Sequence, residues 1–178
     1  ALVTFGNRAY DNALAELVGL MNDGGMYPIG AAAMVTRHVF SDTLGASRPN
    51  AEDVSALEDF ATKVSEKILS SSNDKISALK VPGETHPDKY YTPLKTTNVP
   101  ASFLKAKPSC DIERCSRCGK CVGICPMGSI EVEDGVPVFN GICIKCQACR
   151  LKCPNEAIAF ADPDYHSHIA MIEHNYSS

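Results

Sequence analysis

The first seventy residues alternate between two spacings of hydrophobic side chains. Residues 1–5 form a short apolar run, and residues 10–21 then repeat apolar side chains at the spacing of one helix face. Residues 29–35 are continuously apolar, which predicts a strand covered on both faces. A second helical stripe follows over residues 54–68. The order strand, helix, strand, helix predicts an α/β unit with a parallel sheet.

Glycine and polar residues mark the expected ends of these elements. Gly24 and Gly25 should end the first helix, and Asn50 with Asp53 should cap the amino end of the second. Two strands and two helices cannot cover residues 29–35 on both faces without leaving bare edges. We therefore expect the missing strands to precede this sequence, or to come from another chain or a second copy that completes the sheet.

The remaining chain divides by composition. Residues 71–108 contain five prolines and should form an extended linker. Tyr90–Tyr91 and Phe103–Leu104 are apolar enough to dock it on one domain or the other, and a loose linker is the alternative. Residues 109–163 should form a second domain, and residues 164–178 a frayed or surface-packed tail, with a metal site at its histidines as the alternative.

Short strands are expected inside residues 109–163. Side chains alternate over residues 129–132 and 136–139, on either side of Asp134–Gly135, which is typical of a tight hairpin. Residues 157–160 should add a further short strand.

Cysteines supply the chemistry of this sequence. Eight of the nine fall in two copies of one run, Cys-x2-Cys-x2-Cys-x3-Cys-Pro, which span Cys115–Pro126 and Cys143–Pro154. Each cysteine of the second copy lies 28 residues after its counterpart. This duplication implies two similar half-units related by a pseudo-two-fold axis.

Three chemistries use closely spaced cysteines, and the spacing separates them. Disulfides suit secreted scaffolds, and two-residue spacings make poor bridges. Zinc usually takes two well-separated Cys-x2-Cys pairs. A third thiolate three residues further on, followed by Cys-Pro, is the bacterial ferredoxin run that binds [4Fe–4S] clusters.

In that run the fourth cysteine ligates the other cluster, and we expect it to begin a short helix that points it away from its own loop. Two clusters with crossed ligand sets are therefore predicted. One set is Cys115, Cys118, Cys121 and Cys153, and the other is Cys143, Cys146, Cys149 and Cys125.

Two further features surround the predicted ligands. Cys110 lies outside both runs, and we expect a free thiol without a role, with a fifth ligand or a redox-active thiol as the alternatives. Ten apolar side chains should limit the access of water to the clusters: Ile112, Val122, Ile124, Ile130, Val132, Val138, Ile142, Ile144, Ile158 and Phe160.

Residues 109–163 resemble the bacterial two-cluster ferredoxin domain, which implies a ferredoxin-like α+β fold and one-electron transfer. The stretches Thr4–Asp11 and Arg48–Asp53, with His38 between them, resemble the last two βα units of a flavodoxin-like domain. Together they are similar to the flavodoxin–ferredoxin fusion family of anaerobic bacteria and archaea. Members of that family begin with a further βαβαβ segment that carries a phosphate loop, and this sequence has no such segment.

The flavodoxin resemblance implies where FMN would bind. Ligands of open α/β sheets bind beyond the carboxyl ends of the strands. That rule makes Gly6, Asn7, Arg8 and Tyr10 the candidate flavin contacts, with Tyr10 stacked on the ring. The alternative is that Gly6 only makes a tight turn and Tyr10 only packs on the following helix.

Composition narrows the function further. A net charge of −4 argues against phosphate-driven nucleic-acid binding, and no apolar run approaches the ~20 residues of a membrane-spanning helix. Clustered reduced cysteines imply a reducing, anaerobic cytoplasm. We expect an electron carrier whose partner is a flavoprotein or another oxidoreductase. The alternatives are a flavin-dependent oxidoreductase that the ferredoxin domain supplies with electrons, and a cluster-based sensor.

Overall fold

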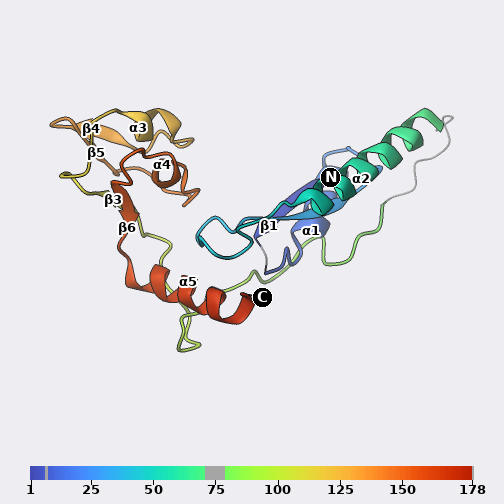
Figure 1. Cartoon of the computed structure of the whole chain (residues 1–178). Coiled ribbons are helices and arrows are strands. Elements are labelled where there is room, and N and C mark those ends of the chain that lie inside the picture. Colours follow the sequence, from blue (N-terminus) through green and yellow to red (C-terminus); the bar gives the residue numbers. More distant parts are fainter. Residues whose placement is uncertain (7, 71–78, 178) are drawn as a thin grey trace. The chain divides into compact units, whose positions relative to one another are not determined.

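The computed structural model describes residues 1–6, 8–70 and 79–177. The chain divides into two compact units, Ala1–Tyr91 with Asn175–Ser178, and Thr92–His174. Figure 1 shows the elements of each unit. Within the described ranges, no helix has both the length and the apolar character needed to cross a bilayer.

The first unit follows the predicted order of elements. It contains β1 (Leu2–Gly6), α1 (Ala13–Asp23), β2 (Ala32–Thr36) and α2 (Ala51–Ser70). The two strands pair in parallel, with Leu2 opposite Ala32 and Gly6 opposite Thr36. The strand–helix–strand–helix prediction is confirmed, although β2 begins at Ala32 rather than at residue 29.

The predicted helix ends are also confirmed. The helix α1 ends at Asp23 with Gly24 as its C-cap, and Gly25 then adopts a φ of 77°, a conformation that glycine reaches without a Cβ clash. Before α2, the Asn50 amide donates to the Asp53 carboxylate at 2.8 Å, and the Asp53 amide donates to the Asn50 side-chain oxygen at 2.9 Å. This reciprocal capping typically contributes about 1 kcal/mol.

The expected burial of the second strand is wrong. Every residue of β2 is half-buried, because an open cavity of about 290 Å³ lies between this strand and α2, lined by Leu57 and Phe60 among others. All residues of α2 are described, and none of them is fully buried. A doubly wound sheet contains more parallel strands than the pair β1–β2, so the flavodoxin-like assignment stays a prediction.

The second unit is built from short elements. They are β3 (Pro108–Cys110), α3 (Lys120–Ile124), β4 (Glu131–Glu133), β5 (Val136–Val138), α4 (Ala148–Leu151), β6 (Ile158–Phe160) and α5 (Pro163–Tyr176). The strands form antiparallel pairs, β4 with β5 and β3 with β6.

Both predicted strand features of this unit are confirmed, and one strand was not predicted. The β4–β5 turn has φ values of 50° at Asp134 and 80° at Gly135, which a two-residue hairpin of this hand requires. Strand β6 matches the predicted strand at residues 157–160. Its partner β3, with Pro108 opposite Phe160, is the strand that the sequence pattern did not reveal.

The duplication also appears in the backbone conformation. Three positions in each copy have positive φ, and they are related by the same 28-residue shift. They are Arg117 (58°), Gly119 (69°) and Gly128 (57°) in the first copy, and Lys145 (56°), Gln147 (61°) and Glu156 (50°) in the second. The second copy therefore holds three non-glycine residues in the left-handed region, at a cost of roughly 1–2 kcal/mol each.

The predicted tail is a helix that packs on its unit, so of the two expectations, frayed or surface-packed, the frayed terminus is wrong. Asp162 caps α5 by accepting a hydrogen bond from the Tyr165 amide at 2.8 Å, and Pro163 occupies the first helical position, where proline is favoured. The helix buries Tyr165, His168, Met171 and Ile172, so it is part of the core of this unit.

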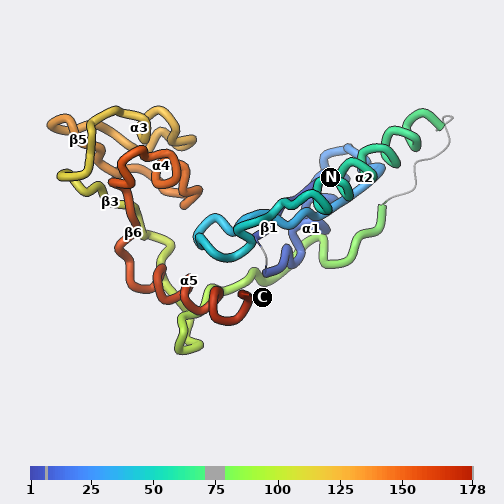
Figure 2. The backbone as a smooth tube through the Cα atoms, in the orientation of Figure 1, coloured from blue at the N-terminus to red at the C-terminus, as the bar shows by residue number. Residues whose placement is uncertain are grey.

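The last part of the predicted linker runs along α5 (Figure 2). The Asp164 carboxylate pairs with Lys95 at 2.6 Å and accepts a hydrogen bond from the Ser102 amide at 2.8 Å. Phe103 is 7% exposed and contacts rings of α5, so its predicted docking is confirmed. The same prediction is wrong for Leu104, which is 89% exposed.

The preceding part of the linker packs on the first unit. The Tyr90 hydroxyl donates to the Glu16 carboxylate at 2.7 Å, and the Glu84 amide donates to the Asn12 side chain at 3.2 Å. The described linker residues are thus docked in two pieces, one on each unit. The Ser70–Asn73 helix break proposed from the sequence falls mostly on residues 71–78, outside the described residues.

Candidate metal-cluster site

Cysteines of the two loops that carry the repeated runs surround two cavities in the second unit. The first cavity, of about 50 Å³, is lined by the thiols of Cys115, Cys118, Cys121, Cys153 and also Cys110. The second, of about 30 Å³, is lined by those of Cys143, Cys146, Cys149 and Cys125. Each cavity therefore takes three cysteines from one copy and the fourth from the other. The structure brings together each of the sets expected from the sequence, and it adds Cys110 to the first.

The size and lining of the cavities suit a polynuclear group. A cavity needs about 10–15 Å³ to admit a single water, so each of these cavities has room for more than one small ion. Within the described residues, no three Cys, His, Asp or Glu side chains converge on a point that could hold a single metal ion. A tetrahedral zinc site would need four ligands about 2.0–2.3 Å from one point. All nine cysteines are described, and none forms a disulfide.

The helices position the third cysteine of each run, which corrects one expectation. Cys121 lies in α3 and Cys149 in α4, whereas the fourth cysteine follows the helix and does not begin one. At Cys125 the backbone is extended, with φ −69° and ψ 112°. Proline at the next position explains this, because its ring disfavours helical conformation in the residue before it.

Backbone amides donate hydrogen bonds to cysteine sulfurs in both copies of the run. The Arg117 amide donates to Cys115 at 3.4 Å, the Ser129 amide to Cys125 at 3.4 Å, and the Ala157 amide to Cys153 at 3.3 Å. Hydrogen bonds to ligating sulfurs stabilise negative charge and are one of the determinants of cluster potential.

The pKa values of the thiols reflect two opposing effects. Burial raises the pKa of Cys149 to about 11 and also raises that of Cys121. Hydrogen bonds from the Lys120 amide and the Ser116 side chain lower the pKa of Cys118. Because the thiolate is the form that binds iron, the buried thiols must lose a proton when they bind it.

Part of the predicted apolar shell lines the cavities. Ile130, Ile158 and Phe160 are buried, at 6%, 3% and 5% exposed, whereas Ile112 and Ile144 are exposed. The shell residues that line the first cavity are Val122, Val132 and Ile158, and those that line the second are Ile130, Ile142 and Phe160. Water access to the cavities is thus limited mainly on the sides formed by β6 and by Ile130.

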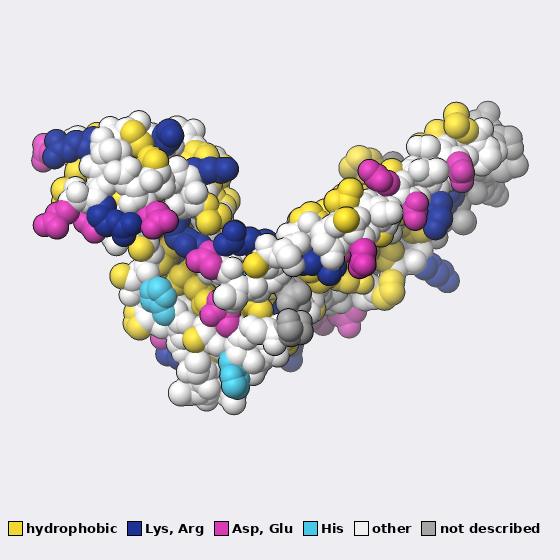
Figure 3. Space-filling view, viewed as in Figure 1, with side chains coloured by type: hydrophobic (Ala, Val, Ile, Leu, Met, Phe, Trp, Pro, Cys, Tyr) yellow, Lys and Arg dark blue, Asp and Glu magenta, His cyan; other side chains and the backbone are white. Residues whose placement is uncertain are grey.

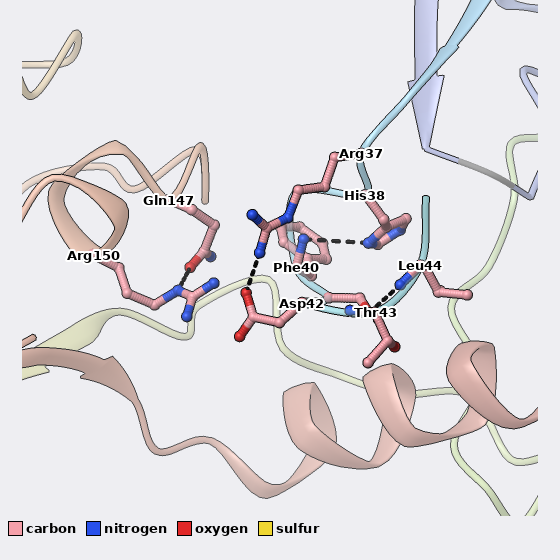
Figure 4. A network of polar contacts seen from close by, with 9 residues as sticks. Arg37, His38, Phe40, Asp42, Thr43, Leu44, Gln147 and Arg150 are labelled. Atoms are coloured by element: carbon pink, nitrogen blue, oxygen red, sulfur yellow. Dashed lines mark hydrogen bonds and ion pairs between the residues drawn. The ribbon is translucent and has the colours of Figure 1, made fainter. Parts of the chain in front are cut away.

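Gln147 is a supporting residue that the sequence did not reveal. Its side chain is 1% exposed and accepts a hydrogen bond from Arg150 at 3.0 Å, which Figure 4 shows at α4. Nearby, the Lys145 ammonium donates to the Leu104 carbonyl at 2.6 Å. Gln147 occupies the position of Gly119 in the other copy, and its buried amide braces the loop that carries Cys146 and Cys149. The one signal in the sequence for this role is that the two copies differ at this position, with glycine at 119 and glutamine at 147.

Charge is distributed unequally around the two cavities. Arg117 and Lys120 both line the first cavity, whereas Lys107 is the one basic residue in the described lining of the second, where the counterpart of Lys120 is Ala148. On the face shown in Figure 3, basic and acidic side chains are interspersed over the part of the molecule that contains the cavities. The unequal lining gives the two cavities different electrostatic environments.

The predicted flavin contacts are only partly brought together. Arg8 and Tyr10 line an open cavity of about 460 Å³ beyond the carboxyl end of β1, but Gly6 does not line it. A Cβ atom on Gly6 would lie 2.7–3.0 Å from three atoms of His38, so this glycine permits a close approach. Asn7 lies outside the described residues.

The side chains at this cavity also have partners within the unit. Arg8 pairs with Asp11 and lies 4.1 Å from the centre of the Tyr91 ring, and the Tyr10 ring packs 5.3 Å from that of Phe5. Figure 4 shows the loop that follows β2, where Arg37 pairs with Asp42 at 2.6 Å. These contacts support a structural role, in which the side chains stabilise the loops that follow β1 and β2.

Comparison with known proteins supports the interpretation of the second unit. The family model described as a 4Fe-4S dicluster domain matches residues 114–158. The chain is 37% identical over 59 residues to an uncharacterized ferredoxin of Methanocaldococcus jannaschii, a match that covers 31% of this chain and 40% of the relative. It is 42% identical over 50 residues to the polyferredoxin protein MvhB of Methanothermus fervidus, covering 28% of this chain and 12% of that protein.

A third relative is named as a subunit of RNA polymerase and not as a ferredoxin. The DNA-directed RNA polymerase subunit Rpo3 of Methanosarcina mazei is 44% identical over 52 residues, a match that covers 29% of this chain and 20% of the subunit. The chain thus spans 40% or less of each of these relatives. Together with the two thiol-lined cavities, the comparisons show that the chain contains a 4Fe–4S dicluster ferredoxin domain whose cysteines bind 4Fe–4S clusters.

Proposed function

We propose that the protein is a one-electron carrier with two [4Fe–4S] clusters held by the crossed cysteine sets. The observation that carries this proposal is the division of eight thiols between the two cavities, three from one copy and one from the other in each case. The ferredoxin relatives support the same function.

The groups around each cavity have separate roles in this proposal. The clusters supply reversible one-electron chemistry, and no substrate bond is made or broken. The thiolates hold the iron, the amides of Arg117, Ser129 and Ala157 stabilise charge on the sulfurs, and β6 excludes water. The partner in this proposal is a redox protein, either a flavoprotein or another oxidoreductase.

Cofactor analysis under anaerobic conditions tests the number of clusters. About eight iron and eight acid-labile sulfide per chain, without zinc, are expected for two cubane clusters. Reversible bleaching of the visible absorbance by a one-electron reductant should accompany them. About four iron per chain, or stoichiometric zinc, would contradict the proposal.

Paired substitutions test the crossing of the ligand sets. If Cys125 and Cys146 bind the same cluster, Cys125→Ala and Cys146→Ala in one chain should remove no more iron than either change alone. The matched pair, Cys125→Ala with Cys118→Ala, should remove about twice as much. The reverse result would mean that each run binds its own cluster.

A second candidate, a flavin-dependent oxidoreductase, is favoured by one observation. The cavity beyond β1, lined by Arg8 and Tyr10, lies where open α/β sheets bind their ligands. The matching experiment is the release of FMN when the purified protein is unfolded. About one flavin per chain, reduced in amount by Tyr10→Ala, would favour this candidate over a simple carrier.

A further inference from the structure

Cys110 is a fifth thiol in the first cavity, which needs only four for a cubane cluster. It is the last residue of β3, opposite Ile158 of β6, and it lines the cavity together with the predicted ligands. Its sulfur donates a hydrogen bond to the Asp111 carbonyl at 3.6 Å. The first cavity is therefore supplied with one ligand more than it requires.

The turn after β3 holds Cys110 and Cys115 close together. The Asp111 amide donates to the Ala157 carbonyl at 2.7 Å, and the Cys115 amide donates to the Asp111 carbonyl at 3.1 Å. The Asp111 carboxylate also accepts a hydrogen bond from the Glu113 amide at 3.0 Å. These bonds fix the five-residue step between the two cysteines, so the position of Cys110 does not depend on a flexible loop.

The second cavity offers a control within the same molecule. In the 28-residue register of the repeat, the counterpart of Cys110 is Val138, and the counterpart of Cys115 is Cys143. The described lining of the second cavity includes four cysteines, and Val138 is not part of it. The two cavities thus differ in whether a spare thiol is present.

We propose that Cys110 is a reserve ligand that takes the place of Cys115 at the cluster of the first cavity. This inference rests on the proposed function, because it requires a cluster at that site. The exchange is not a redox step. The Cys110 thiol loses its proton and forms a bond to iron, while the bond from iron to Cys115 breaks and the released thiolate takes up a proton.

Matched single substitutions test the proposal through iron and sulfide content. In Cys115→Ala, Cys110 should preserve the first cluster, so iron stays near the wild-type value. In Cys143→Ala, no reserve thiol exists and about half of the iron should be lost. Adding Cys110→Ala to Cys115→Ala should also remove about half, whereas Cys110→Ala alone should remove none.

Thiol alkylation of the folded, cluster-loaded protein gives a second readout. In the wild type one thiol per chain should react, and peptide mapping should place it at Cys110. In Cys115→Ala, Cys110 should become protected, because it is then bonded to iron. This comparison does not need the double variant to fold.

Two results would overturn the inference: iron loss in Cys115→Ala equal to that in Cys143→Ala, or continued alkylation of Cys110 in Cys115→Ala. Failure of the proposed function has a different signature, because the wild type itself would then lack about eight iron per chain. The inference is therefore tested separately from the function on which it rests.

Discussion

Gly141 offers a sharp test of the packing beside the second cavity. It lines that cavity together with Ser129. A Cβ atom built on Gly141 would lie 2.5 Å from Oγ of Ser129, 2.6 Å from its Cβ and 2.8 Å from its Cα. The Ser129 hydroxyl also donates to the Ile142 carbonyl at 2.7 Å. Gly141→Ala should therefore force these two segments apart.

The expected magnitude follows from those distances. Carbon atoms in contact normally lie about 3.5–4.0 Å apart, so the added methyl overlaps Ser129 by roughly 1 Å. Rotation of the serine side chain cannot relieve this overlap, because the Cα and Cβ of Ser129 are among the atoms that clash. Overpacking of this kind costs about 1–3 kcal/mol, and loss of the hydroxyl hydrogen bond adds about 1 kcal/mol. A total of about 2–4 kcal/mol is a large part of the stability of a small domain.

The assay is the rate at which the loaded protein loses its visible absorbance in guanidinium chloride under anaerobic conditions. Because each 1.4 kcal/mol is about tenfold, Gly141→Ala should speed the loss by roughly tenfold or more. Gly123→Ala is the matched control, since a Cβ there meets no atom within 4 Å and alanine favours helix. If both variants lose their absorbance at the wild-type rate, the argument from close approach is wrong.

Three further predictions concern other parts of the second unit. Gly119→Ala should destabilise the protein by about 1–2 kcal/mol, because φ is 69° there; a denaturation midpoint equal to that of Gly123→Ala would contradict this. Lys120→Ala should lower the reduction potential of one cluster by roughly 20–40 mV, and Ala148→Lys should raise that of the other. Potentiometric titration measures both shifts, and equal shifts at the two clusters in either variant would refute this prediction. Hydrogen bonding to Lys95 and to an amide lowers the pKa of Asp164 below 3.8, so its stabilising effect should be complete above about pH 4 and lost as the pH falls further. The difference in Tm between the wild type and Asp164→Asn should therefore shrink in acid, and a constant difference would exclude this cause.

Structural features that are encoded within a few residues could be predicted from the sequence. The cysteine runs, the Asn50–Asp53 cap and the Asp134–Gly135 turn are each defined within a few residues, and the structure has a capping box and a hairpin at these places. Strand β3 has three residues and too little length to show a period. It exists because Pro108 pairs with Phe160, a contact between distant parts of the chain.

The C-terminal helix was missed for a different reason. Its buried side chains include His168, whose ring nitrogen lies 2.8 Å from the Leu94 carbonyl. Because a polar histidine stands at a buried position, the apolar side chains of this helix do not form a continuous stripe in the sequence. The Asp162–Pro163 pair was a usable signal of its start. In contrast, the exposure of Leu104 beside the buried Phe103 depends on which side of the linker contacts α5, and the linker sequence does not specify that side.

The interleaving of the two runs has a consequence for how the protein is made. The ribosome synthesises the chain from its amino end, so the first cavity lacks its fourth ligand until Cys153, in the last third of the second unit, has been added. The lining of the first cavity also includes Ile158, and that of the second cavity includes Phe160, both of which belong to β6. A nascent chain that ends before β6 therefore has neither cavity complete. Iron and sulfide can therefore fill a complete cavity only after the residues of β6 have been synthesised.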